Sequence, residues 1–193
     1  MTRIFYFFIF LFFKLTVLAQ DTVPEKKLTI SNPCIRTIQV NGKQVPFTGY
    51  TYTTYRNGRK KTIIPFENGI CSGKGIGYYK NGNIKWTTEN KYGDRNGEQT
   101  LRYESGKLKS KYFDENNIIS GPDTSYYESG AIKSTRQFVN GKLEGKTIFY
   151  FSNGKISEIS NYKNGQLDGD VISYDENGEV INSVKYADGR RVK

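Results

Sequence analysis

The chain has 193 residues, with 29 lysines and arginines against 19 aspartates and glutamates, a formal net charge of +10 and no histidine. Catalytic triads, histidine general bases and histidine-ligated zinc are therefore excluded, and two cysteines are too few for a four-cysteine metal site. The composition is 36% hydrophobic and 25% charged, with 15 tyrosines and 12 phenylalanines, which is typical of a folded, strand-rich protein.

Residues 1–19 have the pattern of a signal peptide. Arg3 provides a positive start, residues 4–13 form a short apolar run, and Val17-x-Ala19 is a small-residue cleavage site before Gln20. A lysine ends the apolar run well short of the roughly 20 residues that a membrane-spanning helix needs. The pattern predicts a protein exported to the periplasm, the envelope or the medium, with an uncleaved membrane anchor as the alternative.

Residues 20–48 form an irregular lead-in. Without the signal peptide the chain keeps a net charge of +8, which predicts an anionic neighbour such as envelope lipid, lipopolysaccharide, an acidic glycan or an acidic protein. Cys34 lies in this lead-in, and Cys71 lies further along the chain. Two cysteines in an oxidising compartment are able to pair, and the alternative is that both are small buried hydrophobic residues.

A period of 24 residues organises residues 49–193 into six units. Three series of glycines recur at this spacing, and Asn117 replaces glycine once in the third series. The series are Gly49, Gly73, Gly97, Gly121, Gly145 and Gly169; Gly58, Gly82, Gly106, Gly130, Gly154 and Gly178; and Gly69, Gly93, Gly141, Gly165 and Gly189.

Each unit has two turns, and Asn-Gly dipeptides occur at many of them, such as Asn57-Gly58 at a first turn and Asn68-Gly69 at a second turn. A type I′ hairpin turn needs positive φ at both central residues, which asparagine and glycine adopt at the least cost. Two turns per unit predict two strands per unit. The fold class expected is therefore all-β, an elongated antiparallel β-meander of stacked hairpins built from six 24-residue repeats.

Two-residue loops at both turns would place aromatic and aliphatic residues opposite each other on one face. The predicted pairs are Tyr79–Ile84, Tyr103–Leu108, Tyr127–Ile132 and Phe151–Ile156 at the first turn, and Phe66–Cys71, Phe138–Leu143 and Tyr162–Leu167 at the second. Such pairs would form a continuous apolar ladder, which one unit cannot bury alone, so stacking of the units is obligatory.

The recurring motif [FY]-x-[NSD]-G appears as Tyr55-Arg-Asn-Gly58, Tyr103-Glu-Ser-Gly106 and Tyr186-Ala-Asp-Gly189. This motif resembles the MORN-repeat variant family over residues 49–192. The resemblance implies a twisted antiparallel sheet of stacked hairpins without catalytic residues. Some bacterial members look like, and are labelled as, antitoxin components of toxin–antitoxin modules, whereas an ordinary antitoxin works in the cytoplasm and this chain is predicted to be exported.

Some units depart from the pattern. In the sixth unit Asp175 replaces the aromatic residue and Arg191 replaces the aliphatic one, as expected of a polar terminal repeat that protects an open sheet edge. In the second and third units Asn90 and Asp114 replace aromatic residues. Local exceptions within a regular array are candidate functional positions.

Lysines recur at one position in four consecutive units. Lys61, Lys85, Lys109 and Lys133 should form a row on the face opposite the apolar ladder, with about 10 Å between equivalent residues. Across the same hairpins we expect to find Tyr78, Arg102 and Tyr126. A stripe of cations and aromatic rings is suited to phosphates, acidic sugars or an acidic partner. The alternative is a solvated face whose lysines discourage sheet stacking.

Trp86 is the only tryptophan. It is either an anchor for a partner or a ring that packs over Gly77, which the predicted register places directly opposite. A second candidate surface combines Trp86 with Tyr92, Tyr112 and Phe113.

Acidic residues form no convincing catalytic pair, and the glycine-rich segment 73–77 leads into a strand rather than the helix that a phosphate loop requires. We therefore expect a non-enzymatic protein without cofactor, metal or specific nucleic-acid partner. Its expected partner is another protein, such as a toxin. The alternative is an anionic membrane surface or glycan.

Overall fold

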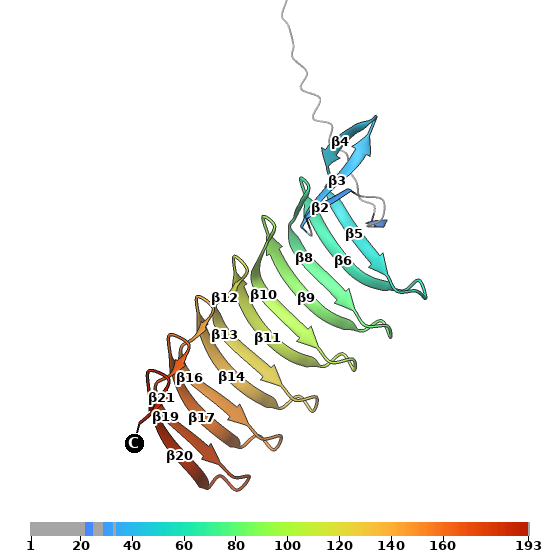
Figure 1. The fold of residues 1–193 in the computed structure, drawn as a ribbon. Helices are drawn as coiled ribbons and strands as arrows, with labels where there is room; N and C mark the ends of the chain where they lie inside the picture. The colour runs from blue at the N-terminus through green and yellow to red at the C-terminus, as the bar shows by residue number, and fades with distance from the viewer. Residues whose placement is uncertain (1–21, 25–28, 33, 193) are drawn as a thin grey trace, which may run out of the picture.

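The computed structural model describes residues 22–24, 29–32 and 34–192, so the predicted signal peptide lies outside the described residues. Regular structure in these residues consists of 21 strands in one sheet. No helix in the described ranges is long and apolar enough to cross a membrane. Figure 1 shows the hairpins stacked side by side along one direction.

Each of the six units contributes two long strands that pair antiparallel with each other and with the neighbouring units, as predicted. These strands are β5 (Gly49–Thr54), β6 (Lys60–Glu67), β8 (Gly73–Tyr78), β9 (Ile84–Lys91), β10 (Asp94–Arg102), β11 (Leu108–Glu115), β13 (Gly121–Tyr126), β14 (Ile132–Val139), β16 (Gly145–Tyr150), β17 (Ile156–Lys163), β19 (Gly169–Tyr174) and β20 (Val180–Ala187). Short strands follow most second turns: β7 (Ile70–Cys71), β12 (Ile118–Ile119), β15 (Lys142–Leu143), β18 (Gln166–Leu167) and β21 (Arg190–Arg191).

The second turns have the predicted geometry. Asn68 and Gly69 both have positive φ, at 49° and 82°, as a type I′ turn requires. The predicted pairs at this turn are confirmed: Phe66–Cys71, Phe138–Leu143 and Tyr162–Leu167. From the second unit on, each second turn also bonds to the preceding unit, as when the amide of Gly93 donates to the carbonyl of Cys71 at 2.9 Å.

The first turns differ from the prediction. In the second unit the amide of Tyr79 donates to the carbonyl of Asn83 at 2.8 Å, so three residues form the loop rather than two. Only Gly82 in this loop has positive φ, while the Asn81 side chain accepts from the amide of Asn83 at 2.9 Å. The predicted first-turn pairs are therefore wrong by one residue, and the observed pairs are Tyr78–Ile84, Arg102–Leu108, Tyr126–Ile132 and Tyr150–Ile156.

Tyrosines of the first turns reach into the next unit. The hydroxyl of Tyr55 donates to the carbonyl of Tyr78 at 2.7 Å, and the same bond, at 2.6–2.7 Å, recurs in the next three units. In the fifth unit the residue is Phe151, which has no hydroxyl. The aromatic residue of the motif therefore links units through a polar group as well as through its ring.

The described part of the lead-in contains four strands, β1 (Thr22–Pro24), β2 (Thr29–Asn32), β3 (Ile35–Val40) and β4 (Lys43–Pro46). β3 and β4 form a hairpin around Asn41-Gly42, and β1 pairs parallel with β5 at the edge of the first unit. We call residues 34–47 the N-terminal cap. The cap contributes Phe47 to a small hydrophobic core with Phe66 and Cys71, all at most 3% exposed.

Away from this core, the most buried side chains of the repeats are mainly polar: Thr51, Gln99, Thr100, Asp114, Asp123, Ser134, Thr147 and Ser160. Short hydroxyl residues bond across strands, as Ser125 and Ser134 do at 2.7 Å. The sixth unit ends the array with β20, whose Val180 and Ile181 are 59% and 67% exposed. The terminal edge is thus less polar than the sequence suggested.

Candidate binding surface

The predicted row of lysines lies at β-bulges next to the first turns. Gly77 pairs with Trp86 and Tyr78 pairs with Ile84, so Lys85 is the extra residue on β9. Lys61, Lys109 and Lys133 occupy the same bulge position in their units. A bulge redirects a side chain relative to the pleat. The three-residue loop and the bulge therefore fix where these ammonium groups point.

Each bulge lysine lies over the tyrosine ring of its own first turn. The distances from Nζ to the ring centre are 5.9, 5.5, 5.5 and 5.6 Å, for Lys61 over Tyr55, Lys85 over Tyr79, Lys109 over Tyr103 and Lys133 over Tyr127. All four lysines are exposed, and the rings are half-buried. Within the described residues none of the four forms a salt bridge with a carboxylate. A cation over an aromatic face is stabilised while its charge stays accessible to a partner.

Tyr78, Arg102 and Tyr126 are not across the hairpin from the lysines. Their cross-strand neighbours are aliphatic residues, because the three-residue loop shifts the register by one position. Their carbonyls accept the tyrosine hydroxyls of the preceding unit, and Arg102 Nη1 donates to the carbonyl of Gly106 at 3.0 Å. The rings that alternate with the lysines are therefore those of the first-turn tyrosines.

Charge changes sign along the edge of the sheet formed by the six first turns, which we call the first-turn edge. Segment 54–61 of the first unit has four basic residues and no acidic one, namely Arg56, Arg59, Lys60 and Lys61. The equivalent segment of the sixth unit, 174–181, has three acidic residues and no basic one, namely Asp175, Glu176 and Glu179. An anionic partner is therefore attracted to the N-terminal part of this edge and repelled at its other end. Comparing charge at equivalent repeat positions would have found this gradient from the sequence.

Trp86 packs over Gly77, as one of the two interpretations predicted. A Cβ atom at Gly77 would lie 2.2 Å from the indole ring, so the ring occupies the space above the glycine. The indole is half-buried. Its position is explained by cross-strand packing.

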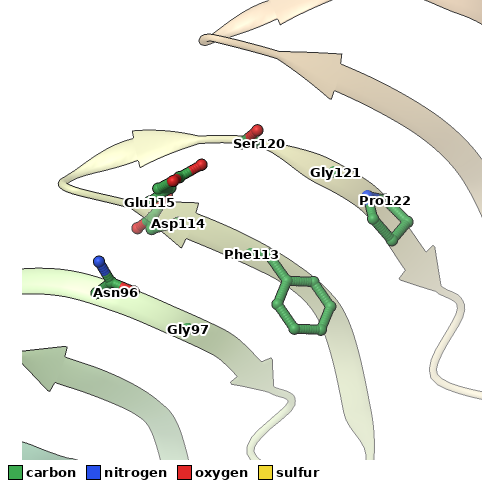
Figure 2. A pocket seen from close by; sticks show the side chains of 8 residues that line it. All are labelled: Asn96, Gly97, Phe113, Asp114, Glu115, Ser120, Gly121 and Pro122. Carbon is green, nitrogen blue, oxygen red and sulfur yellow. The ribbon is translucent and has the colours of Figure 1, made fainter.

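Trp86, Tyr92, Tyr112 and Phe113 do not form one surface. Tyr112 and Phe113 are consecutive residues of β11 and therefore point to opposite faces of the sheet. Tyr92 stands apart at a second turn, 80% exposed and with a positive φ of 53°, where most other units have asparagine. Figure 2 shows Phe113 of β11 and Pro122 of β13 on neighbouring strands. Both residues, together with Asp114, line a hollow of about 480 Å³.

Two ion pairs that sequence reasoning missed lie in the middle of the array, one between the second and third units and one within the fourth unit. Arg95 Nε lies 3.1 Å from Asp114 Oδ2, and Arg136 Nη2 lies 2.5 Å from Asp123 Oδ2. Burial raises the pKa of Asp123, against the effect of Arg136. Burial raises the pKa of Tyr112, and the charge of Asp114 raises it further. Each carboxylate is paired with an arginine, and the Arg95–Asp114 pair links the second unit to the third, whereas the Asp123–Arg136 pair joins the two strands of the fourth unit.

Three segments of the chain match the MORN repeat variant family: residues 95–113, 143–164 and 167–188. They are centred on the third, fifth and sixth units of the 24-residue period. The predicted resemblance is therefore confirmed for three of the six repeats, and the match gives no support to an antitoxin label. No curated protein matches the chain. Repeats of this family are commonly non-catalytic modules that bind proteins or membranes.

Proposed function

We propose that this protein is a non-enzymatic scaffold that binds an acidic protein partner along the N-terminal part of its first-turn edge. The observation that carries this proposal is the set of four exposed lysines, each held over a tyrosine ring and without a carboxylate partner. Folding does not require lysine at these bulges, because Ser157 occupies the position in the fifth unit and Ile181 occupies it in the sixth.

The spacing of the lysines suits an extended acidic segment. Equivalent residues two strands apart are about 10 Å apart, which about three residues of extended chain span. A lysine already resting on a ring loses less conformational freedom on binding than one that is free to rotate. The acidic first turn of the sixth unit repels an acidic segment, so the segment binds nearer to the first unit.

An anionic envelope surface is the second candidate function, because lysine and tyrosine together are suited to lipid headgroups. Both candidates agree with the export that we propose from residues 1–19. An immunity-like or antitoxin-like role is one form that binding to a protein partner would take.

The test is a pair of charge-matched variants. The edge variant changes Lys61, Lys85, Lys109 and Lys133 to Glu, and the control variant changes four exposed lysines elsewhere to Glu, namely Lys142, Lys146, Lys163 and Lys185. Both lower the net charge equally, and exposed substitutions usually alter stability by about 0.5 kcal/mol or less each. Binding is measured with a fluorescent poly-glutamate peptide and with phosphatidylglycerol vesicles, at low salt and at about 0.5 M salt.

The proposal predicts that wild type and the control variant bind the peptide and that the edge variant does not. An equal loss in the two variants would show that net charge alone drives binding and would refute a role for the edge. Wild type could instead bind the vesicles and not the peptide, and the edge variant could lose this vesicle binding. That result would show that the surface binds a membrane rather than an acidic protein.

A further inference from the structure

The two cysteines lie opposite each other where the N-terminal cap meets the first unit. Ile35 of β3 pairs antiparallel with Ile70 of β7, so the next pair in register is Cys34 with Cys71. The amide of Cys71 donates to the carbonyl of Cys34 at 3.2 Å. Opposed residues of an antiparallel pair have Cα atoms about 4.5–5.5 Å apart, within the about 4.4–6.8 Å that a disulfide accepts.

The side chains also meet. Both residues carry thiols in the structure, and the nearness of the Cys34 side chain adds to burial in raising the pKa of the Cys71 thiol. Cys71 is 2% exposed in the core with Phe47 and Phe66, and Cys34 packs against the same core while remaining half-buried. Directly opposed residues of an antiparallel pair point to the same face, so the two sulfur atoms lie on the same side of the sheet.

We propose that Cys34 and Cys71 form an intramolecular disulfide that fastens the N-terminal cap to the first repeat. The cap is joined to the repeat sheet at this place through a single register pair between β3 and β7. Backbone bonds near the second turn add to it, such as the 2.8 Å bond from the amide of Arg36 to the carbonyl of Gly69. A covalent link at the same place would keep the cap closed over Phe66.

The reaction requires a disulfide oxidant, for which oxidised glutathione serves. The thiolate of Cys34 attacks one glutathione sulfur, forms a mixed disulfide and releases one glutathione thiolate. The thiolate of Cys71 then attacks the Cys34 sulfur, forms the protein disulfide and releases the second glutathione. Two electrons pass to the oxidant, and the two protons of the cysteine thiols end on the released glutathiones.

Exposure sets the order of these steps. Burial raises the pKa of the Cys71 thiol, against the charge of Arg36, so at neutral pH Cys71 is protonated and shielded. The external oxidant therefore meets the half-buried Cys34 first, and Cys71 acts as the resolving thiol from within the core. The product is buried beside aromatic rings and should resist reduction.

The test uses the full purified chain incubated with oxidised glutathione, quenched with acid and alkylated. Intact mass should show loss of two hydrogens and no alkylation, and tryptic digestion should link peptide 28–36 to peptide 62–74. The melting temperature should rise by about 5–15 °C, because the link closes a loop of some 37 residues in the unfolded chain. Cys34→Ser is the matched control and should show neither the link nor the rise.

Thiols that stay open to alkylation after oxidation would overturn the proposal. So would a product that stops at the glutathione mixed disulfide, a disulfide-linked dimer in place of the internal link, or a lower melting temperature. Cys71→Ala keeps the apolar core and provides a second control if the serine variant folds poorly. None of these outcomes depends on the partner, so the disulfide and the binding proposal fail or succeed separately.

Discussion

Replacing Tyr127 by phenylalanine should weaken the contact between the fourth and fifth units. The Tyr127 hydroxyl donates to the carbonyl of Tyr150 at 2.6 Å in a partly buried setting. Phenylalanine keeps the ring under Lys133, so the substitution removes only the hydrogen bond. The chain provides the reverse experiment, because Phe151 occupies the same position one unit later, and Tyr174 is the residue equivalent to Tyr150.

A hydrogen bond of this kind contributes about 1 kcal/mol to the free energy of unfolding. Tyr127→Phe should therefore lower the melting temperature by about 2–4 °C, as expected for a chain of this size. Phe151→Tyr should raise it by a similar or smaller amount, because it supplies the missing bond to the last unit. In the double variant the two effects should nearly cancel, since the bonds lie in different unit interfaces.

Thermal unfolding of the four proteins measures these shifts, and hydrogen exchange locates them. Stability in a stacked array is a sum of units and neighbour interfaces, so amides flanking the altered interface should change most. The reasoning would be refuted if Tyr127→Phe and Phe151→Tyr both left the melting temperature unchanged. That result would mean that water serves these carbonyls as well as the tyrosine hydroxyl does.

Four other outcomes are expected. Gly77→Ala should cost about 1–3 kcal/mol and shift tryptophan fluorescence to the red, because its Cβ would lie 2.2 Å from Trp86; an unchanged spectrum would contradict this packing. Tyr92→Asn should raise the free energy of unfolding by about 1 kcal/mol in chemical denaturation, because Tyr92 has positive φ at an exposed turn. Backbone donors, Glu179 first, lower the pKa of Asp175, so its charged form stabilises the fold fully above its ordinary value of 3.8. The advantage of wild type over Asp175→Asn should shrink as the pH falls through the lowered pKa, and an acid titration followed by circular dichroism checks this. Mass spectrometry of protein recovered from cells should find Gln20 as the first residue, and an intact Met1 in a soluble cytoplasmic fraction would contradict export.

The 24-residue period and the second-turn register were predictable from the sequence alone, because both depend on local backbone preferences. Asn68 and Gly69 adopt positive φ more cheaply than other residues, which permits the two-residue turn that the structure shows. The opposition of Gly77 and Trp86 was also predicted correctly. The three-residue loop shifts the pairing next to the turn by one residue, and the extra residue Lys85 of the bulge shifts it back. Beyond the bulge the strands therefore pair as predicted.

The first turn was decided by tertiary structure. Asn-Gly fits both a two-residue loop and a three-residue loop, because each places glycine at positive φ. The three-residue loop coexists with contacts that no single hairpin contains, notably the hydroxyl of Tyr79 bonded to the carbonyl of Arg102, 23 residues further on. The backbone preferences of the loop residues do not include a hydrogen bond whose acceptor belongs to another unit, so they could not predict the loop length.

The charged and thiol pairs depend on stacking in the same way. Asp114 stands out in the sequence as a polar residue at an aromatic position, but its partner Arg95 belongs to the preceding unit. Cys34 meets Cys71 only because the cap folds back onto the second turn of the first unit. The sequence by itself determined where strands and turns lie, since these follow from backbone conformation within a few residues. Which side chains meet between units was decided by the tertiary structure, because that depends on the loop length and bulge that set how each hairpin lies against the next.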